Sequence, residues 1–286
     1  MKHLLLAGIA AALFAPAVSA QTSDEDPGFS GVYVGAAGGY DVQPNDVGSS
    51  ILFDRNLDGT FGDVVNTTTA PNAFAPPIGG FCNGRALGAT SPTNTTTPAG
   101  CANDKDGWAY YGRVGWDNQR GNFVVGVVGE FGKSEITDSV SAFSSTPASY
   151  VMTRSIDWEA SIRGRVGYTP NNTTLFYGTF GPGYARIDRD FTTTNTANSF
   201  SESGKRNQWG ITGGGGIEQR IGRNFSLGLE YMYHQYQDND YRVRAGSTGT
   251  TPGTNPFLLA GTGTDFRRSD DKFRWHSLRA TAAFRF

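Results

Sequence analysis

The stretch DRNLDGTFGD, residues 54–63, places oxygen-bearing side chains at alternate positions, and Gly59 follows them. Calcium takes carboxylate and amide oxygens as ligands, and calcium loops use a glycine for their tight turn. The spacing therefore predicts a calcium site. The twelfth position is Val65 rather than a bidentate Glu, so an Asp/Asn/Gly turn without metal is the alternative. The candidate ligands are Asp54, Asn56, Asp58 and Asp63, the last standing in for the missing Glu.

A second set of candidates consists of charges that alternate with apolar residues along short segments. This period of two indicates β-strands with two different faces. Inside a closed sheet, such charges would either pair and plug the interior or line a narrow, gated pore. Both alternatives stay open from the sequence. The predicted interior charges are Arg113, Glu130, Asp157, Glu159, Arg163, Arg165, Glu218, Arg220, Glu230, Arg279 and Arg285.

The histidines could act as catalytic bases beside a serine. His276 precedes Ser277 directly, but neighbouring residues of a strand point to opposite faces. The other candidate histidine is His234, and the sequence places no acid to orient His276. We therefore assign no catalytic residues and expect a non-enzymatic protein.

The first 20 residues have the pattern of an export signal. A positive start at Lys2 precedes an apolar run, and small residues at Val18 and Ala20 prepare a cleavage site. The run is too short to span a membrane as a helix, so the mature chain is expected to be 21–286. In an oxidising compartment Cys82 and Cys101 are expected to form a disulfide, because two cysteines offer too few ligands for a metal.

Eight segments of ten residues or slightly more have the length that a tilted strand needs to cross a membrane. A charge facing lipid at the midplane costs roughly 2–4 kcal/mol, so the charged faces should point inward. Lipid offers no partner for an open strand edge, which requires closure into a barrel. The predicted strands are 31–40, 108–117, 122–132, 156–168, 174–187, 208–220, 224–236 and 273–286.

The connections alternate between short turns and long loops, which is the organisation of outer-membrane barrels. The first long loop covers residues 41–107, and the whole mature chain is expected to be one domain. The 39 Gly, 19 Phe, 12 Tyr and 5 Trp suit twisted strands that end in aromatic girdles. The formal net charge of -2 gives no reason to expect nucleic-acid binding.

These features resemble the small eight-stranded outer-membrane β-barrels of the OmpA/OmpX type, and within them the porin family of alphaproteobacteria. The resemblance rests on the export signal, on SGVYVGAAGGY, and on RATAAFRF with its aromatic Phe286. It implies a Gram-negative outer membrane, contact with lipid and lipopolysaccharide, and recognition of the last strand by the assembly machinery. It implies a structural or surface-interaction role, with a narrow channel for small solutes as the alternative.

The last long loop carries a group of arginines that could meet lipopolysaccharide phosphates. Nearby aspartates could instead pair with them, and exposed pairs contribute little to stability. The arginines are Arg242, Arg244, Arg267 and Arg268, and the aspartates are Asp238, Asp240, Asp270 and Asp271.

Overall fold

The computed structural model describes residues 28–88, 100–146 and 148–286, so the expected export signal, residues 1–20, lies outside the described part. Eight long strands close into an antiparallel barrel, which confirms the predicted fold. Each strand pairs with the next, and the first pairs with the last. In ring order they are β1 (Gly31–Val42), β6 (Gly107–Arg120), β7 (Phe123–Ser134), β9 (Ala148–Tyr168), β10 (Thr174–Thr193), β12 (Asn207–Ile221), β13 (Phe225–Gln237) and β16 (Lys272–Arg285).

The seam between β1 and β16 closes the ring, with paired residues from Tyr33↔Arg285 to Val42↔His276. On the other side of β1, where it pairs with β6, a glycine lets an aromatic ring approach the backbone closely. The ring of Tyr33 lies where a side chain would stand at Gly115 of β6, so a Cβ at that position would collide with it. Closure leaves no unpaired edge among the eight strands, as a barrel surrounded by lipid requires.

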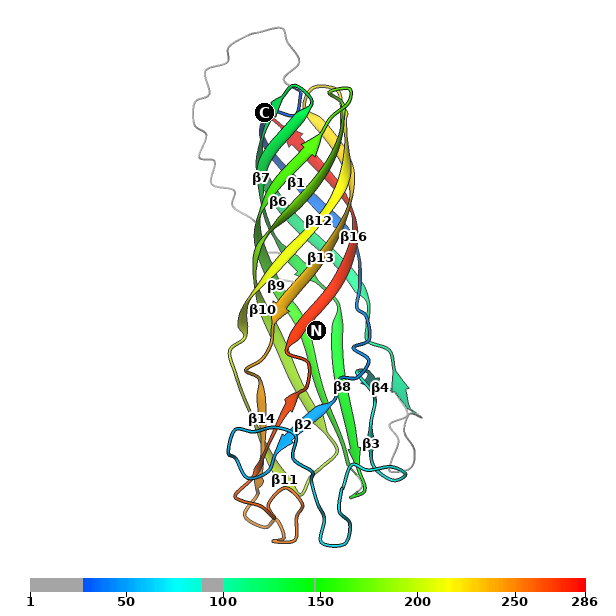
Figure 1. The fold of residues 1–286 in the computed structure, drawn as a ribbon, viewed down its shortest axis with the longest axis vertical. Helices are drawn as coiled ribbons and strands as arrows, with labels where there is room; N and C mark the ends of the chain where they lie inside the picture. The colour runs from blue at the N-terminus through cyan, green and yellow to red at the C-terminus, as the bar shows by residue number, and fades with distance from the viewer. Residues whose placement is uncertain (1–27, 89–99, 147) are drawn as a thin grey trace, which may run out of the picture.

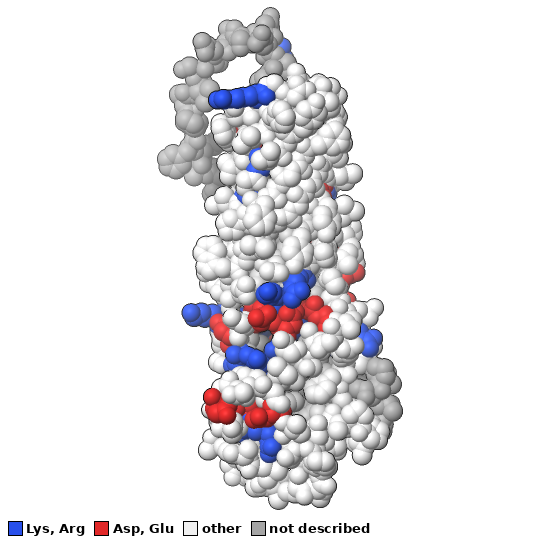
Figure 2. Space-filling model, in the orientation of Figure 1, with Lys and Arg blue, Asp and Glu red and all other residues white. Residues whose placement is uncertain are grey.

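The outer face of the barrel is apolar. Large exposed side chains such as Phe180 and Leu229 point outward from it. Aromatic contacts mark its two ends, with Phe123 against Tyr168 near the short turns and Tyr40 against Trp108 near the long loops. On the face shown in Figure 2, charged residues gather in a belt halfway along the molecule, and few lie between this belt and the short-turn end. This uncharged surface with aromatic ends has the character of a membrane-spanning band.

Beyond the charged belt the described parts of the four long connections fold together into a second layer, which we call the head (residues 43–88, 100–106, 135–146, 148–157, 187–206 and 238–271). A four-stranded sheet of β11 (Asn198–Ser203), β14 (Arg242–Ser247), β15 (Thr264–Arg268) and β2 (Ile51–Asp54) forms one part of it. β8 (Thr137–Ser144) pairs with β9 and with β3 (Gly80–Phe81), while β4 (Ala86–Leu87) pairs with β5 (Cys101–Ala102). Figure 1 shows these strands below the barrel, at the end opposite the chain's C-terminus.

The head has an apolar core of its own. Phe53, Phe74, Tyr150, Phe257 and Phe266 are buried together there, and their rings contact one another. This core explains why β9 and β10 are longer than the strands predicted at 156–168 and 174–187: their additional residues pack into the head. Among the described residues, no helix is long and apolar enough to cross a membrane.

Candidate functional site

The structure places ten of the eleven predicted interior charges inside the barrel, buried and arranged in layers. In the middle layer, Arg279 Nη2 lies 2.6 Å from Glu230 Oε1 and 2.8 Å from Glu130 Oε2. Arg163 reaches Glu130 at 2.7 Å, and Arg113 reaches Glu230 at 3.0 Å. The side chains of these residues are at most 6% exposed. Three arginines and two glutamates therefore form one connected network across the lumen.

A second layer of ion pairs lies nearer the short turns. Asp117 Oδ2 is 2.9 Å from Arg165 Nη1 and 3.0 Å from Arg285 Nη2, and Glu218 pairs with the same two arginines. Asp117 is not among the predicted interior charges. The signal was present, because Asp117 lies four residues after Arg113 on the same face of β6.

Arg220 also lies at the short-turn end of the lumen. Its Nη1 donates to the Asn172 carbonyl at 3.2 Å, and its guanidinium lies 5.8 Å from the ring of Phe29. The side chain thus contacts the turns that close this end of the barrel.

The third layer is centred on Glu159, towards the long-loop end. Its carboxylate accepts hydrogen bonds from Tyr111 at 2.5 Å and Tyr236 at 2.7 Å, and it lies 3.1 Å from His234 Nδ1. The His234 ring stacks on Trp275 with centroids 4.7 Å apart. These aromatic partners were absent from the predicted site. The sequence could have indicated them, because Tyr111, His234 and Tyr236 lie at the positions of β6 and β13 that alternation assigns to the interior.

The predicted inward orientation of Asp157 is wrong. A β-bulge shifts the register of β9 against β10, so that Arg186 pairs with Trp158 while Ile187 pairs with Ile156. The extra residue sends Asp157 to the outer surface, where its carboxylate lies 3.4 Å from Arg186. Ile156 is buried instead, although the alternation had assigned it to the outer face. A bulge adds one residue to a strand and so interrupts the period of two. An alternation continued through the bulge therefore assigns the side chains beyond it to the wrong face.

An apolar layer closes the lumen on the head side of Glu159. Ile136, Ile156, Ile187, Phe273 and Trp275 are buried together there. Side chains therefore fill the described barrel through three polar layers and one apolar layer, in agreement with the narrow interior of eight strands.

Beyond this layer, in the head, the buried side chain of Arg154 connects several loops. Arg154 lies 2.6 Å from Asp138, 3.2 Å from Asp238, 3.2 Å from Asp270 and 3.4 Å from Asp46. These carboxylates come from the first, second and fourth long connections. The Arg154 guanidinium thus fixes the loops relative to one another.

Carboxylates outnumber arginines around Arg154, and this changes the pKa values of the aspartates there. Burial and the neighbouring carboxylates of Asp138 and Asp270 raise the pKa of Asp46 to about 8. Burial and Asp138 likewise raise the pKa of Asp104 to about 7. Burial alone would raise the pKa of Asp138, but Arg154 and a second arginine in the head outweigh it and hold that pKa below its usual value. The cluster therefore carries protons at pH values where ordinary aspartates are ionised.

The predicted calcium stretch forms a tight loop whose oxygens meet its own backbone. Asp54 accepts from the backbone N–H groups of Asp58 at 3.2 Å and Gly59 at 2.8 Å, and Asp63 accepts from the N–H of Arg55 at 2.8 Å. The fourth candidate, Asn56, donates to Asp58 at 2.9 Å. Among the described residues, no group of three or more His, Cys, Asp or Glu side chains is arranged to hold a metal ion. The contacts match the turn alternative, and calcium binding stays a prediction.

The remaining candidates lie in the head. Cys82 and Cys101 form the expected disulfide. Arg268 is buried, and its Nη2 lies 2.6 Å from Asp138 Oδ1. Arg244 forms an ion pair with Asp265. The guanidinium groups of the other two arginines in the predicted group, Arg242 and Arg267, lie over the ring of Phe61. Two of the four arginines therefore pair with aspartates, although with different aspartates from those expected.

A model described as "Outer membrane protein beta-barrel domain" matches residues 8–251. The "22 kDa outer membrane protein" of Rhizobium leguminosarum bv. viciae is 32% identical over 146 residues, which are 50% of this chain and 61% of that protein. The "31 kDa outer-membrane immunogenic protein" of Brucella melitensis biotype 1 is 31% identical over 122 residues, 42% of this chain and 50% of that protein. The matches therefore span between half and three fifths of these relatives.

Among solved structures, the outer membrane protein OprG from Pseudomonas aeruginosa aligns with a TM-score of 0.48 and 12% identity. The alignment covers 91% of this chain and 98% of OprG. The outer membrane protease OmpT from Escherichia coli aligns with a TM-score of 0.40 and 8% identity, over 90% of this chain and 97% of OmpT.

Proposed function

The chain belongs to the outer membrane β-barrel family and is an integral protein of the Gram-negative outer membrane, and we propose that it acts as a closed scaffold that displays the head at the cell surface. In this role the barrel holds the head in a fixed position and conducts no solute. Surface interaction is then a property of the head, and the barrel contributes anchoring and rigidity.

The observation that carries this proposal is the network around Arg279. Its guanidinium joins Glu130 and Glu230 inside the lumen, and Arg113 and Arg163 complete the layer. An ion passing through would have to separate buried charges from their partners, which costs several kcal/mol for each charge left unpaired. An ion would meet the same cost at the layer of ion pairs around Arg165 and at the hydrogen-bonded layer around Glu159.

The proposed role is non-enzymatic. His276 lies on the outer side of β16, where its Nδ1 is 2.6 Å from the hydroxyl of Tyr231. Ser277 is buried on the inner side, where its hydroxyl donates to Asp41. The geometry thus supports the expectation that these neighbours do not form a nucleophile and its base.

The strand β16 is also our candidate for recognition by the outer-membrane assembly machinery. Leu278 and Phe284 point outward from it, and they are 64% and 47% exposed. The neighbouring ring of Phe286 lies 5.2 Å from Phe284. This proposal predicts that replacing both Phe284 and Phe286 by Ser reduces the folded protein recovered from outer membranes.

The closed scaffold is tested by recording currents of the mature protein in planar bilayers. We expect no steps from protein whose folding has been checked by its heat-dependent electrophoretic mobility. Discrete steps that scale with salt would establish the channel instead. Replacing Glu159 or Arg163 would then have to change their size for the lumen charges to line the pore.

A further inference from the structure

A surface hollow of about 370 Å³ lies between three of the loops that form the head. Its lining, residues 146, 148, 194–197, 252 and 254–257, comes from the second, third and fourth long connections, and we call it the tip hollow. We propose that the tip hollow binds a neutral sugar residue. Such a site rests on the proposed function and deepens it, because it gives the displayed head a ligand of defined chemistry.

The tip hollow lies towards the end of the molecule that is opposite the membrane band. β9 and β10 are the longest of the described strands, and they stay paired into the head as far as Thr193↔Tyr150. The lining begins beyond this pair, at Thr194 and at Ala148. Figure 1 shows β11, which starts at Asn198 beside the lining, near the end of the molecule opposite the C-terminus. A ligand therefore reaches the tip hollow from the external medium rather than from the bilayer.

Three asparagines hold the third and fourth connections together at the tip hollow. The amide oxygen of Asn198, a residue that is 6% exposed, accepts from Asn195 Nδ2 at 3.0 Å and from Asn255 Nδ2 at 2.9 Å. The amide oxygen of Asn255 accepts from the N–H of Phe257 at 3.0 Å. Asn195 Nδ2 also donates to the hydroxyl of Tyr150 at 3.0 Å. These bonds fix the two amides that line the tip hollow.

Further hydrogen bonds fix the backbone around the tip hollow. The N–H of Ser149 donates to Thr194 Oγ1 at 2.9 Å, and the N–H of Thr194 donates to the Ser149 carbonyl at 3.2 Å. Thr251 Oγ1 donates to the carbonyl of Ala197 at 2.7 Å. Because the three loops are joined before a ligand arrives, binding costs little conformational entropy.

Two threonines present hydroxyl groups to a ligand. Thr196 and Thr254 line the tip hollow and are exposed. Within the residues that the structure describes, neither side chain makes a hydrogen bond, whereas the hydroxyl of Thr194 is already bonded. A hydroxyl both donates and accepts, so Thr196 and Thr254 can each pair with a hydroxyl of a ligand.

The rest of the lining is mostly apolar. Phe257 is 3% exposed and packs on Tyr150, with ring centroids 5.6 Å apart, so it forms a firm base for the tip hollow. Ala197 and Pro252 are exposed beside it. Among the described residues that line the tip hollow, none carries a charge.

This combination favours a neutral ligand with both polar and apolar faces. A charged ligand would lose hydration without gaining an opposite charge. An entirely apolar ligand would cover the hydroxyls of Thr196 and Thr254 without pairing them. A sugar ring offers hydroxyl groups to the threonines and a C–H surface to the apolar residues. The volume lies near the lower end of the roughly 300–1,000 Å³ of small-molecule sites, which suits a ligand of this size.

The experiment measures binding to the folded, mature protein by saturation-transfer NMR. The micelles consist of a zwitterionic detergent, because a detergent with a sugar headgroup would compete for the site. The neutral probes are glucose, galactose, mannose and N-acetylglucosamine, and glucuronic and galacturonic acids are the charged counterparts. The variants are Thr196→Val, Thr254→Val and Ala197→Trp. Thr68→Val, which changes an exposed threonine of the first long connection, is the matched control. Heat-dependent electrophoretic mobility verifies that every variant is folded.

We expect at least one neutral sugar to bind, and both acids to bind at least tenfold more weakly. Thr196→Val and Thr254→Val should each weaken the binding about fivefold, which corresponds to one neutral hydrogen bond. Ala197→Trp should fill the tip hollow and abolish binding, and Thr68→Val should leave it unchanged.

The proposal would be overturned if none of the four neutral sugars received saturation, if the acids bound equally well, or if Ala197→Trp bound as tightly as the unaltered protein. The currents in planar bilayers test the scaffold separately. A barrel that conducts no ions and binds none of the sugars would therefore overturn the sugar site and leave the scaffold role standing.

Discussion

The guanidinium of Arg279 lies 2.8 Å from the carboxylate of Glu130 across the lumen, although β16 and β7 are separated in the ring by β1 and β6. The same nitrogen lies 2.6 Å from Glu230 on the neighbouring strand β13. One side chain thus connects opposite walls of the barrel. This cross-link couples the strands beyond their backbone hydrogen bonds, which explains why an interior full of charge can be rigid.

Replacing Arg279 by Gln should destabilise the barrel by about 3 kcal/mol. Removal of one partner of a buried pair typically costs 3–5 kcal/mol, and Arg163 and Arg113 still compensate part of the glutamate charge. The measurement is the free energy of unfolding in detergent, with guanidinium as denaturant. Arg120→Gln serves as the control, and equal stability of the two variants would contradict the structural role of the network.

Much of the barrel could be predicted from the sequence, because its strands follow simple periodicity. Apolar and charged residues alternate in β13 and β16. Glu230 and Arg279, which this alternation assigns to the interior, are paired across the two strands. The prediction failed at Asp157, because a bulge adds a single residue that no local pattern announces. An error of one residue reverses every orientation beyond it.

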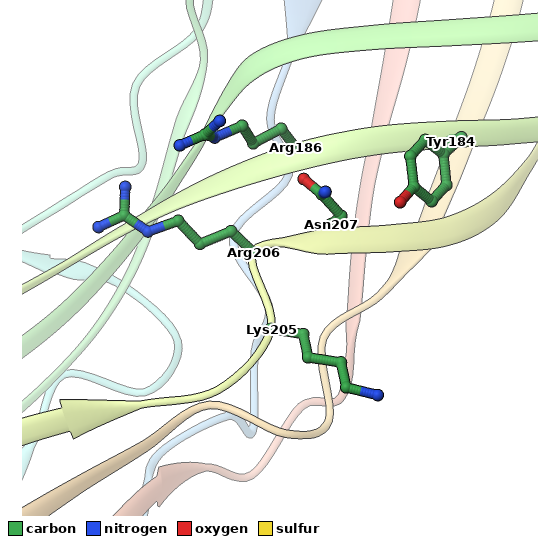
Figure 3. Close-up of a pocket in the computed structure, with 5 residues that line it drawn as sticks. All are labelled: Tyr184, Arg186, Lys205, Arg206 and Asn207. Atoms are coloured by element: carbon green, nitrogen blue, oxygen red, sulfur yellow. The ribbon is translucent and has the colours of Figure 1, made fainter.

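The head could not be predicted in the same way. Its core joins residues as distant as Phe53, Tyr150 and Phe266, and no periodic segment connects them. The surface hollow that Arg186 and Arg206 help to line, between β10 and β12, was missed for a related reason (Figure 3). Arg186 and Arg206 are twenty residues apart, and the pairing of β10 with β12 brings them together. Contacts of this kind depend on register, which turns and bulges set.

Arg154→Gln should loosen the head while leaving the membrane barrel intact. The substitution leaves the buried Asp138 and Asp238 and the partly buried Asp270 with less positive charge, so the loops that carry them should separate more often. Limited proteolysis should therefore cleave the variant's head at least tenfold faster, with unchanged heat-dependent mobility of the protected barrel. Arg274→Gln, whose side chain is 43% exposed, should behave like the unaltered protein. Equal cleavage rates of both variants would show that Arg154 does not hold the loops of the head together.

The disulfide between Cys82 and Cys101 should stabilise the head by about 3 kcal/mol, since it closes a loop with a sequence separation of 19. Reduction, or the replacement of both cysteines by Ser, should increase cleavage within residues 43–106 and leave the barrel unaffected. The reduced protein and the double Ser variant should give the same cleavage pattern. A pattern identical to that of the oxidised protein would show that the loop is held by its other contacts.

Calcium binding by residues 54–63 can be tested directly by calorimetry. If Asp54, Asn56, Asp58 and Asp63 bind the ion, titration should release or absorb heat in the unaltered protein. Asp58→Ala should abolish that heat, because Asp58 contributes a carboxylate at the centre of the stretch. Glu135→Ala, an exposed carboxylate elsewhere, should retain it. Absence of heat, or equal heat in both variants, would leave the stretch as a hydrogen-bonded turn.

The stability of the head should fall as the pH rises from about 4 to about 8. Folding raises the pKa of Asp46 from 3.8 to about 8, through burial and the neighbouring carboxylates, and raises that of Asp104 to about 7. Between these values the folded head binds more protons than the unfolded chain, so stability decreases with pH and becomes constant above the folded pKa. Protection factors of head amides, measured by hydrogen exchange at pH 5 to 8, should decline accordingly. Asp46→Asn should flatten this decline, and protection that rises with pH would contradict it.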